Sequence, residues 1–577
     1  MNLTTLKELN KIKERFRKRE TAAGRRVVVC AGTACLLSGS LNVYDRFVHA
    51  SMAAGLNTIV ELTREEEGIF VSKSGCQGFC QKGPLVAIKP EGIFYTKVRP
   101  DDVEEIVETT LIRGEIVQRL LYAEPDTGRV CTTAGEIPFY REQRRFVLAQ
   151  CGVIDPENIE EYIAAGGYAA ATAACFDLSP EEICDAVTAS GLRGRGGGGF
   201  PTGRKWRAAR MAEDTKKYVI CNGDEGDPGA FKDRGIMEGN PHSIIEGMII
   251  ASRAIGADEG YAYVRAEYPL AVARLRKAVE DANRLGVLGK GLLGSQHSFH
   301  LDVMEGAGAL VCGEETALMA SIEGKRGMPA PRPPFPTECG LWGKPTVINN
   351  VETLSTVPLL LLPADGDRFR QMGTKDSPGT KTFSVSGHVV NTGLVEMPLG
   401  STLRQIVYHV AGGTTMDDGT PANDGFKAAQ IGGSFGGCLT REHFDVPIDF
   451  DPLQEVGAMM GSGGLVVMNG ETCMVSVARY FMRFNQSESC GKCVPCREGT
   501  RQMLALLDDI IEGRATEETL EILEDLAMMV RKGSLCGLGR SAPNPVLSTL
   551  RHFRDEYVAH VTHKRCPTGK CKGLTAP

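Results

Sequence analysis

The sequence lacks a long hydrophobic run, an excess of positive charge and an export signal. No run of about 18 or more apolar residues occurs among its 577 residues, so no membrane-spanning helix is expected. The 65 lysines and arginines are outnumbered by 72 acidic residues, giving a formal net charge of −7 and arguing against a nucleic-acid-binding protein. The first 20 residues are basic, but no apolar segment follows them, so we expect a cytoplasmic protein without a secretory leader. A chain of this length is too long for a single core and should form several domains.

Cysteine, by contrast, is abundant. The chain has 19 cysteines, and several of them cluster at short spacings. In a protein without an export signal such clusters indicate metal sites rather than a disulfide framework. The remaining cysteines are expected to pack as small hydrophobic residues.

The first cysteine cluster lies in a small α/β pattern over residues 26–113. Cys30 and Cys35 form a C-x4-C pair, and Cys76 and Cys80 form a C-x3-C pair 40 residues later. Four thiolates in two close pairs suit a 2Fe–2S cluster, with a structural zinc ion as the alternative. The pattern resembles the thioredoxin-like 2Fe–2S ferredoxins, which implies that fold for this segment.

A glycine-rich stretch spans Gly191–Trp206. It has seven glycines in 16 residues, interleaved with arginine and lysine. Successive glycines let backbone N–H groups turn inward into a nest that binds phosphate, and nearby cations strengthen the binding. A flexible surface loop is the alternative interpretation. No Gly-Lys-Ser/Thr ending is present, so the stretch is not a Walker loop.

Polar residues follow two apolar strand patterns after this loop. The strand Tyr218–Cys221 ends in an acidic segment, residues 222–227, at the edge where α/β folds place ligands. A second glycine turn, residues 306–315, ends in Glu314 and Glu315. These two carboxylates either complement a helix dipole or bind ribose hydroxyls or an amide of a ligand.

The C-terminal part has the pattern of a helical bundle with a further cysteine cluster. Cys490, Cys493 and Cys496 form C-x2-C-x2-C, and Cys536 supplies a fourth thiol. This arrangement indicates a 4Fe–4S cluster.

A last set of ligand-type residues is dispersed in the sequence. Cys473, His560, Cys566 and Cys571 together make a Cys3His set of the kind that binds structural zinc. His552 and His563 are rival ligands, and thiols without any metal are the alternative.

Together these segments resemble the NADH- and FMN-binding subunit of respiratory complex I, and the beta subunits of NAD-dependent hydrogenases and formate dehydrogenases, over residues 125–562. The resemblance implies a multidomain α/β chain: a thioredoxin-like 2Fe–2S domain, a Rossmann-like FMN/NAD domain, a β-grasp domain and a helical bundle with a 4Fe–4S cluster. The expected boundaries are 1–24 for an N-terminal helix, 25–115 for the 2Fe–2S domain, 116–175 for a connector, 176–370 for the FMN and NAD domain, 371–455 for the β-grasp domain, 456–560 for the bundle and 561–577 for a tail with the zinc site.

The resemblance also implies the residues that bind each cofactor. FMN would contact the glycine loop, the acidic segment, the second glycine turn and a pair of amides: Gly194, Arg195, Gly196, Gly197, Gly199, Lys205, Asn222, Asp224, Glu225, Gly313, Glu314, Asn349 and Asn350. The nicotinamide dinucleotide would contact Phe200, Glu315, Arg332 and Phe335, with Glu315 and Phe200 orienting the nicotinamide. No side chain is expected to act as a catalytic acid, base or nucleophile, because the flavin carries the chemistry.

Three residues depart from the pattern typical of complex I subunits. Asp227 stands where glutamate is frequent, Leu310 where tyrosine is frequent, and Arg332 where lysine is frequent. All three lie near the expected dinucleotide and leave the choice between NADH and NADPH open, and Asp227 is itself an expected cofactor contact.

The predicted function is that of a diaphorase-type subunit. It would exchange hydride between NAD(H) and FMN and pass single electrons through iron–sulfur clusters to a catalytic alpha subunit, an iron–iron hydrogenase first and a formate dehydrogenase as the alternative. A small 2Fe–2S gamma subunit is an expected further partner. Two competing hypotheses are a complex I flavin subunit and a flavin-free iron–sulfur scaffold.

Overall fold

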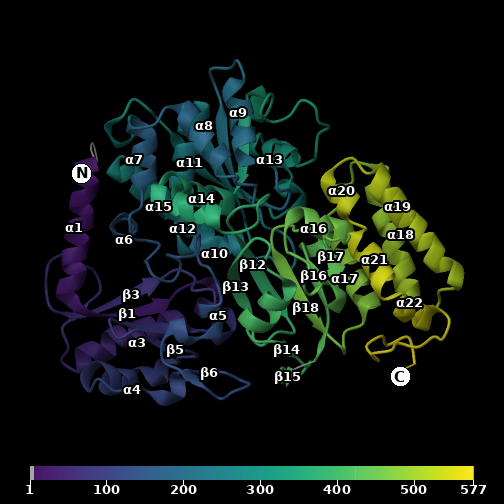
Figure 1. The fold of residues 1–577 in the computed structure, drawn as a ribbon, viewed down its shortest axis with the longest axis horizontal. Coiled ribbons are helices and arrows are strands. Elements are labelled where there is room, and N and C mark those ends of the chain that lie inside the picture. The colour runs from purple at the N-terminus through teal and green to yellow at the C-terminus, as the bar shows by residue number, and fades with distance from the viewer. Residues whose placement is uncertain (1–5, 423, 576–577) are drawn as a thin grey trace.

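The N-terminal part of the computed structural model, which describes residues 6–422 and 424–575, is a five-stranded sheet with helices against it (Figure 1). The strand order is β2-β3-β1-β4-β5, with β1 parallel to β3 and antiparallel to β4. The strands are β1 (Gly24–Cys30), β2 (Thr58–Ile59), β3 (Gly68–Ser74), β4 (Val86–Lys89) and β5 (Ile93–Tyr95). The helices are α1 (Leu6–Ala23), α2 (Thr33–Leu37), α3 (Ser40–Ala53) and α4 (Val103–Ile106), which continues as a π-helix over Val107–Ile112. The valines of β1 are fully buried, which explains why this strand is central.

A connector of short elements follows. It contains β6 (Tyr122–Ala123), β7 (Val130–Cys131), α5 (Pro138–Arg141), α6 (Ile159–Ala164) and α7 (Ala169–Phe176). Cys131, Cys151 and Cys175 are buried here, as expected for packing residues.

The next unit is a parallel sheet of order β10-β9-β8-β11. Its strands are β8 (Tyr218–Gly223), β9 (Glu259–Arg265), β10 (His300–Gly306) and β11 (Thr346–Asn350). Its helices are α8 (Pro180–Ala189), α9 (Thr202–Met211), α10 (Lys232–Gly239), α11 (Pro241–Ile255), α12 (Pro269–Leu285), α13 (Glu315–Ile322), α14 (Val351–Leu361) and α15 (Pro363–Gln371). The carboxyl ends of β8 and β11 lie side by side, because Asn350 pairs with Asn222 in the register.

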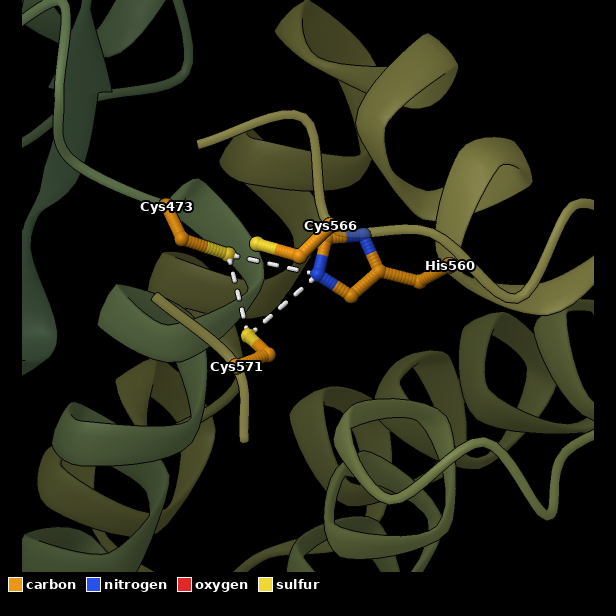
Figure 2. A group of neighbouring side chains, drawn as sticks. All are labelled: Cys473, His560, Cys566 and Cys571. Atoms are coloured by element: carbon orange, nitrogen blue, oxygen red, sulfur yellow. Dashed lines mark hydrogen bonds between the residues drawn. The ribbon is translucent and has the colours of Figure 1, made fainter. Parts of the chain in front are cut away.

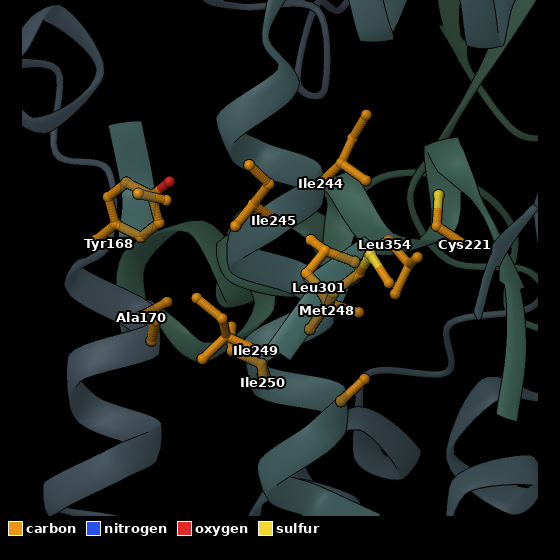
Figure 3. Close-up of a cluster of buried hydrophobic side chains, with 14 of the residues drawn as sticks. Tyr168, Ala170, Cys221, Ile244, Ile245, Met248, Ile249, Ile250, Leu301 and Leu354 are labelled. Atoms are coloured by element: carbon orange, nitrogen blue, oxygen red, sulfur yellow. The ribbon is translucent and has the colours of Figure 1, made fainter. Parts of the chain in front are cut away.

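Helix α11 is the centre of the largest hydrophobic core. Figure 3 shows Ile244, Ile245 and Met248 of this helix between Tyr168 on one side and Leu354 on the other. Almost every residue of α11 is buried, so it is covered on all sides by α7, α14 and the sheet. Each such aliphatic side chain contributes about 1.5–3 kcal/mol on burial, which makes this helix the rigid support of the neighbouring strand ends.

A second mixed sheet follows, of order β13-β12-β18-β16-β17. Its first and last strands, β12 and β18, are parallel neighbours in the centre, which is the β-grasp arrangement. The strands are β12 (Thr380–Gly387), β13 (Gly393–Pro398), β16 (Phe426–Ile431), β17 (Gly437–Leu439) and β18 (Gly464–Asn469), with a small hairpin of β14 (Thr414–Thr415) and β15 (Pro421–Ala422). A π-helix, Gln405–Val410, and α16 (Phe450–Glu455) complete the unit. Strand β18 lies within residues 456–560, the range that the sequence assigned to the bundle.

The last unit is a helical bundle. It consists of α17 (Met474–Ser487), α18 (Val494–Ile511), α19 (Glu517–Gly533), α20 (Gly537–Ser541), α21 (Asn544–His552) and α22 (Arg554–Val561). The N-terminal unit and the bundle lie at opposite ends of the long axis in Figure 1, with the two other sheets between them. In the described residues, no helix is both long and apolar enough to span a membrane.

Candidate functional site

The glycine-rich loop connects α8 to α9 and is held by its neighbours at close range. A Cβ on Gly196 would lie 3.0 Å from Cβ of Asn350, and one on Gly199 would lie 2.7 Å from the ring of Phe450. Gly197 has a φ of 122°, a conformation that favours glycine. Gly198 has open space around it. The loop is therefore an ordered turn rather than a flexible linker, with space beside Gly198.

Arg195 does not direct its side chain toward this open space. Its guanidinium is fully buried and donates to the carbonyls of Arg193 and Pro378, at 3.1 and 2.7 Å. Its backbone N–H donates to Oγ1 of Thr353 at 2.9 Å. Burial lowers the pKa of Arg195 to about 10. This side chain joins the loop to the β-grasp unit, and the cofactor contact of Arg195 stays a prediction.

Lys205, one helical turn into α9, lies among the predicted dinucleotide residues. Its ammonium group pairs with Glu315 at 2.5 Å and donates to the carbonyl of Ile348 at 3.0 Å. Arg332 pairs with the other oxygen of Glu315 at 3.1 Å. Two cations therefore bind one partly exposed carboxylate. Either cation could release Glu315 and bind a phosphate group of a ligand instead. Phe200 and Phe335 are each about half exposed, at 50% and 51%.

Glu314 stabilises the start of a helix, one of the two roles that the sequence allowed for it. Its carboxylate accepts the backbone N–H groups of Thr316 and Ala317 at 2.9 and 3.1 Å, so it caps α13. The preceding residue, Gly313, borders the acidic segment, because a Cβ on Gly313 would lie 3.2 Å from the carbonyl oxygen of Asp224.

Asp224 carries an unpaired buried oxygen. Its Oδ2 atom has no hydrogen-bond partner, and burial raises the pKa of Asp224 to about 7. Asn222 donates to the carbonyl of Gly313 at 2.8 Å and so joins the two glycine-containing segments. A buried acceptor without a donor is costly unless a ligand supplies one. The hydroxyls of a ribityl chain or the N–H groups of a flavin ring fit that requirement.

Other predicted contacts serve the protein itself. Glu225 is buried and accepts the N–H groups of Asp233 and Arg234, which fixes the start of α10, and burial raises its pKa to about 7. Asp227 accepts from the backbone N–H and hydroxyl of Ser434, at 3.0 and 2.6 Å, and burial raises its pKa to about 6.

The two predicted amides, Asn349 and Asn350, already make hydrogen bonds within the protein. Asn349 accepts from the indole N–H of Trp206 at 2.8 Å. Asn350 caps α14 and donates to Asp233 at 2.7 Å. Their side chains orient the strand end and leave less capacity for a ligand than the sequence implied.

A buried ionic network beneath the loop was not found from the sequence. Lys232 pairs with Asp233 at 2.6 Å and with Glu352 at 3.2 Å. Lys381 pairs with the same Glu352 at 2.5 Å, and burial lowers the pKa of Lys381 to about 7. These side chains come from α10, α14 and β12, so only the tertiary structure brings them together.

The Cys490 set lies where the bundle meets the parallel-sheet unit. All four thiols are partly buried, Cys493 precedes α18 and Cys536 precedes α20. The N-terminus of a helix favours negative charge, which suits thiolate ligands. In the described residues, these four thiols do not form a group whose ligand atoms all lie within 4.8 Å of one another, which suits ligands of a multinuclear cluster.

Two contacts attach this cysteine loop to the second glycine turn. Glu488 accepts the backbone N–H of Leu310 at 3.0 Å, and Lys492 donates to the carbonyl of Pro329 at 2.6 Å. The loop is therefore adjacent to the segment that carries Gly313 and Glu315.

The N-terminal cysteines form two contacting pairs. A hydrogen bond from Cys35 lowers the pKa of Cys30, and one from Cys76 lowers the pKa of Cys80. Cys30 ends β1, and Cys80 opens a short 3-10 helix. Two pairs of thiols fit two iron atoms, each with two cysteine ligands.

The Cys473 set is far tighter (Figure 2). Its four ligand atoms all lie within 4.8 Å of one another, and all four residues are buried. Sγ of Cys473 is 3.4 Å from Nε2 of His560 and 3.6 Å from Sγ of Cys571. The second ring nitrogen of His560 bonds the carbonyl of Glu556 at 2.6 Å, which aims Nε2 at the sulfurs. His552 and His563, the rival ligands, are outside this group.

Three family models match the chain. The Nuo51 FMN-binding domain matches residues 187–359, the NADH-ubiquinone oxidoreductase-F iron–sulfur binding region matches 476–560, and the thioredoxin-like [2Fe–2S] ferredoxin matches 13–111. The NADP-reducing hydrogenase subunit HndC of Solidesulfovibrio fructosivorans is 47% identical over 434 residues, which is 75% of this chain and 87% of that protein. The chain belongs to the family of FMN-binding NADH dehydrogenase subunits.

Further members of the family agree with this assignment. An NADH-quinone oxidoreductase subunit of Rhizobium meliloti is 44% identical over 73% of this chain and 98% of its own length. An NAD+-reducing [NiFe]-hydrogenase in its H2-reduced state has a TM-score of 0.64 and 30% identity, covering 96% of this chain and 90% of that chain.

Membership confirms the resemblance, the fold class and the enzyme class predicted from the sequence. The chain is an NAD(P)H-dependent flavin and iron–sulfur oxidoreductase subunit of the hydrogenase or complex I type, with FMN, a 4Fe–4S cluster and a 2Fe–2S cluster as its cofactors.

Proposed function

We propose that this subunit exchanges hydride between NAD(H) and FMN and passes single electrons to the hydrogen-converting subunit of an iron–iron hydrogenase. The observation that carries this proposal is the attachment of the Cys490 loop to the second glycine turn, through Glu488 with Leu310 and Lys492 with Pro329. This attachment brings the electron-accepting cysteines close to the proposed flavin residues. FMN, when bound, converts a two-electron hydride into single electrons, which iron–sulfur clusters require.

The protein's own residues bind and orient in this proposal. Backbone N–H groups of Gly196–Gly199 and the ammonium of Lys205 hold the flavin phosphate, and Asp224 accepts a hydrogen bond from the flavin or its ribityl chain. Glu315, released from Lys205 when the phosphate binds, orients the nicotinamide half together with Phe200. Arg332 and Phe335 hold the rest of the dinucleotide.

We assign the iron–sulfur ligands from the spacing of the thiols. Cys490, Cys493, Cys496 and Cys536 hold the 4Fe–4S cluster, and all four lie within the matched iron–sulfur region 476–560. Cys30, Cys35, Cys76 and Cys80 hold the 2Fe–2S cluster.

We assign zinc to the Cys473 set. Tetrahedral ligands at about 2.3 Å from one ion lie about 3.7 Å apart, close to the contacts of 3.4 and 3.6 Å in this group. A 4Fe–4S cluster at this position is the alternative, but its four ligands bind different irons and need wider spacing. Cys473, Cys566 and Cys571 also lie outside the matched iron–sulfur region.

The cellular setting follows from the same proposal. We expect a cytoplasmic complex in which the catalytic alpha subunit and a small 2Fe–2S gamma subunit bind this chain. A formate dehydrogenase and a complex I type NADH:quinone oxidoreductase are the alternatives for the partner. The HndC relative, by its name, belongs to an NADP-reducing hydrogenase, which makes nucleotide preference the first quantity to measure.

The test is to isolate the native complex and identify its subunits, then assay hydrogen-dependent reduction of NAD+ and NADP+. Co-isolation of a hydrogenase subunit, a flavin absorbance band and hydrogen-dependent reduction of NAD+ support the proposal. A formate dehydrogenase partner, or a reconstituted protein without flavin, would contradict it.

A further inference from the structure

Helix α10 spans the distance between the flavin-side residues and the N-terminal cysteine loop. At its start, Asp233 accepts a hydrogen bond from Asn350 at 2.7 Å. At its end, the carboxylate of Glu238 accepts the backbone N–H of Thr33 at 2.9 Å and the hydroxyl of the same residue. The helix has eight residues, which corresponds to about 12 Å. One short rigid element therefore touches both redox sites.

Glu238 is a buried anion beside the cysteines. Its side chain is 1% exposed, and Arg234 approaches it only at 3.9 Å. Thr33 lies between Cys30 and Cys35, so the carboxylate contacts the loop that joins two of the proposed 2Fe–2S ligands. A charge in this position is poorly screened by solvent.

A second buried side chain fixes the same contact. Arg274 of α12 donates to the carbonyl of Glu238 at 2.7 Å and to that of Ala31 at 2.9 Å. The backbones also meet directly, because a Cβ on Gly75 would lie 2.3 Å from Cα of Gly239. Both cysteine loops, that of Ala31 and that of Gly75, are thus pressed against the end of α10.

We infer that Glu238 is a positioning residue for electron exchange with the 2Fe–2S cluster: it holds the Cys30–Cys35 loop on the flavin unit, and its negative charge keeps the cluster's midpoint potential low. The inference rests on the proposed assignment of Cys30, Cys35, Cys76 and Cys80. The physical reason is that reduction adds negative charge to the cluster, which a nearby carboxylate buried from solvent disfavours, while net charge and hydrogen bonding set iron–sulfur potentials.

The test uses Glu238→Gln in the full-length holoprotein. Glutamine keeps the volume and an acceptor for Thr33 but removes the charge. An EPR-monitored redox titration should show the 2Fe–2S signal reduced at a higher potential. The expected shift is about tenfold in the ratio of reduced to oxidised cluster at fixed potential, equal to about 59 mV for one electron. The midpoint potential of the 4Fe–4S cluster should not move.

Two further variants separate charge from contact. Glu238→Asp keeps the charge and should keep the low potential. Glu157→Gln removes a more exposed carboxylate, which lies 3.4 Å from Arg274, and should shift the potential much less. An unchanged potential in Glu238→Gln, or an equal shift in Glu157→Gln, would overturn the inference, as would loss of the cluster in both Glu238 variants. A wild-type protein without any 2Fe–2S signal would instead refute the ligand assignment.

Discussion

The C-terminal half of the molecule contains two sets of four ligand residues that differ chiefly in spacing. The Cys473 set has all its ligand atoms within 4.8 Å and is buried. The Cys490 set has partly buried thiols, and in the described residues its ligand atoms do not all lie within 4.8 Å of one another. The N-terminal cysteines, in two contacting pairs, lie between these extremes. On the proposed assignments, the tightest set would hold one ion, the N-terminal pairs two irons and the Cys490 set four irons.

The two sets also differ in what lies next to them. The Cys490 loop contacts the second glycine turn, where the proposed flavin residues are. The Cys473 set joins the start of α17 to the end of α22 and to the segment 566–571 that follows it. The first position suits electron transfer, and the second suits fixing the bundle.

The largest expected effect on electron transfer comes from removing one ligand of the Cys490 set. Cys536→Ser should remove the 4Fe–4S cluster, lowering bound iron from about six to about two per chain. Electron transfer from NADH to the partner should fall by at least about 10–100-fold, because the route from the flavin is lost. Iron analysis and a partner-linked assay measure both. Cys339→Ser, at an exposed cysteine, is the control. Retention of all the iron in Cys536→Ser would contradict the assignment.

The second largest effect is expected from removing one ligand of the Cys473 set. Cys571→Ser should remove one zinc per chain and destabilise the bundle by more than about 3 kcal/mol, since structural zinc contributes about 10–16 kcal/mol in small domains. Zinc analysis and denaturant unfolding of the full-length protein are the measurements. Ser476→Ala changes a neighbour 3.3 Å from the Cys571 sulfur and should retain the zinc. Loss of four irons instead of one zinc would move the 4Fe–4S cluster to this set.

A smaller effect on turnover is expected at the N-terminal pairs. Cys80→Ser should abolish the 2Fe–2S EPR signal but leave the 4Fe–4S signal intact, because the two sets of cysteines belong to separate folding units, the N-terminal sheet unit and the helical bundle. Reduction of ferricyanide by NADH should change less than about threefold, because this oxidant accepts electrons from the flavin without either cluster. Simultaneous loss of the 2Fe–2S and 4Fe–4S signals would show that the Cys30 and Cys490 sets are not independent.

The smallest effect concerns Asp224, which follows strand β8 in the parallel-sheet unit. Burial raises its pKa to about 7 from an ordinary value near 4, so its contribution to stability is present at low pH and is lost as the pH rises through about 7. In flavin-free protein, Asp224→Asn should therefore be more stable than wild type by about 1–2 kcal/mol at pH 8 and show little gain at pH 4. Urea unfolding at both values measures this. Asp302→Asn, an exposed carboxylate of the same sheet, should show no such difference.

Much of the architecture followed from sequence patterns, whereas individual contacts did not. Cysteine spacing predicted the Cys30 and Cys490 sets, because close thiols have few other uses in such a chain, whereas the residues of the Cys473 set are dispersed in the sequence. Glu225 and Asp227 were expected to bind cofactor, yet they cap α10 and bond Ser434. A carboxylate in an acidic loop looks the same in sequence whether it faces a ligand or its own backbone.

By itself, the sequence determined the family and the fold class, since spacing and periodicity are local properties, and it predicted the three ligand sets. Only the tertiary structure decided that Cys473 meets Cys571 across 98 positions, that Arg195 turns inward, and that Glu238 contacts the loop of Cys30. The physical reason is that these contacts depend on how separate helices and strands pack, and packing across long sequence separations leaves no periodic signal in the residues that it joins.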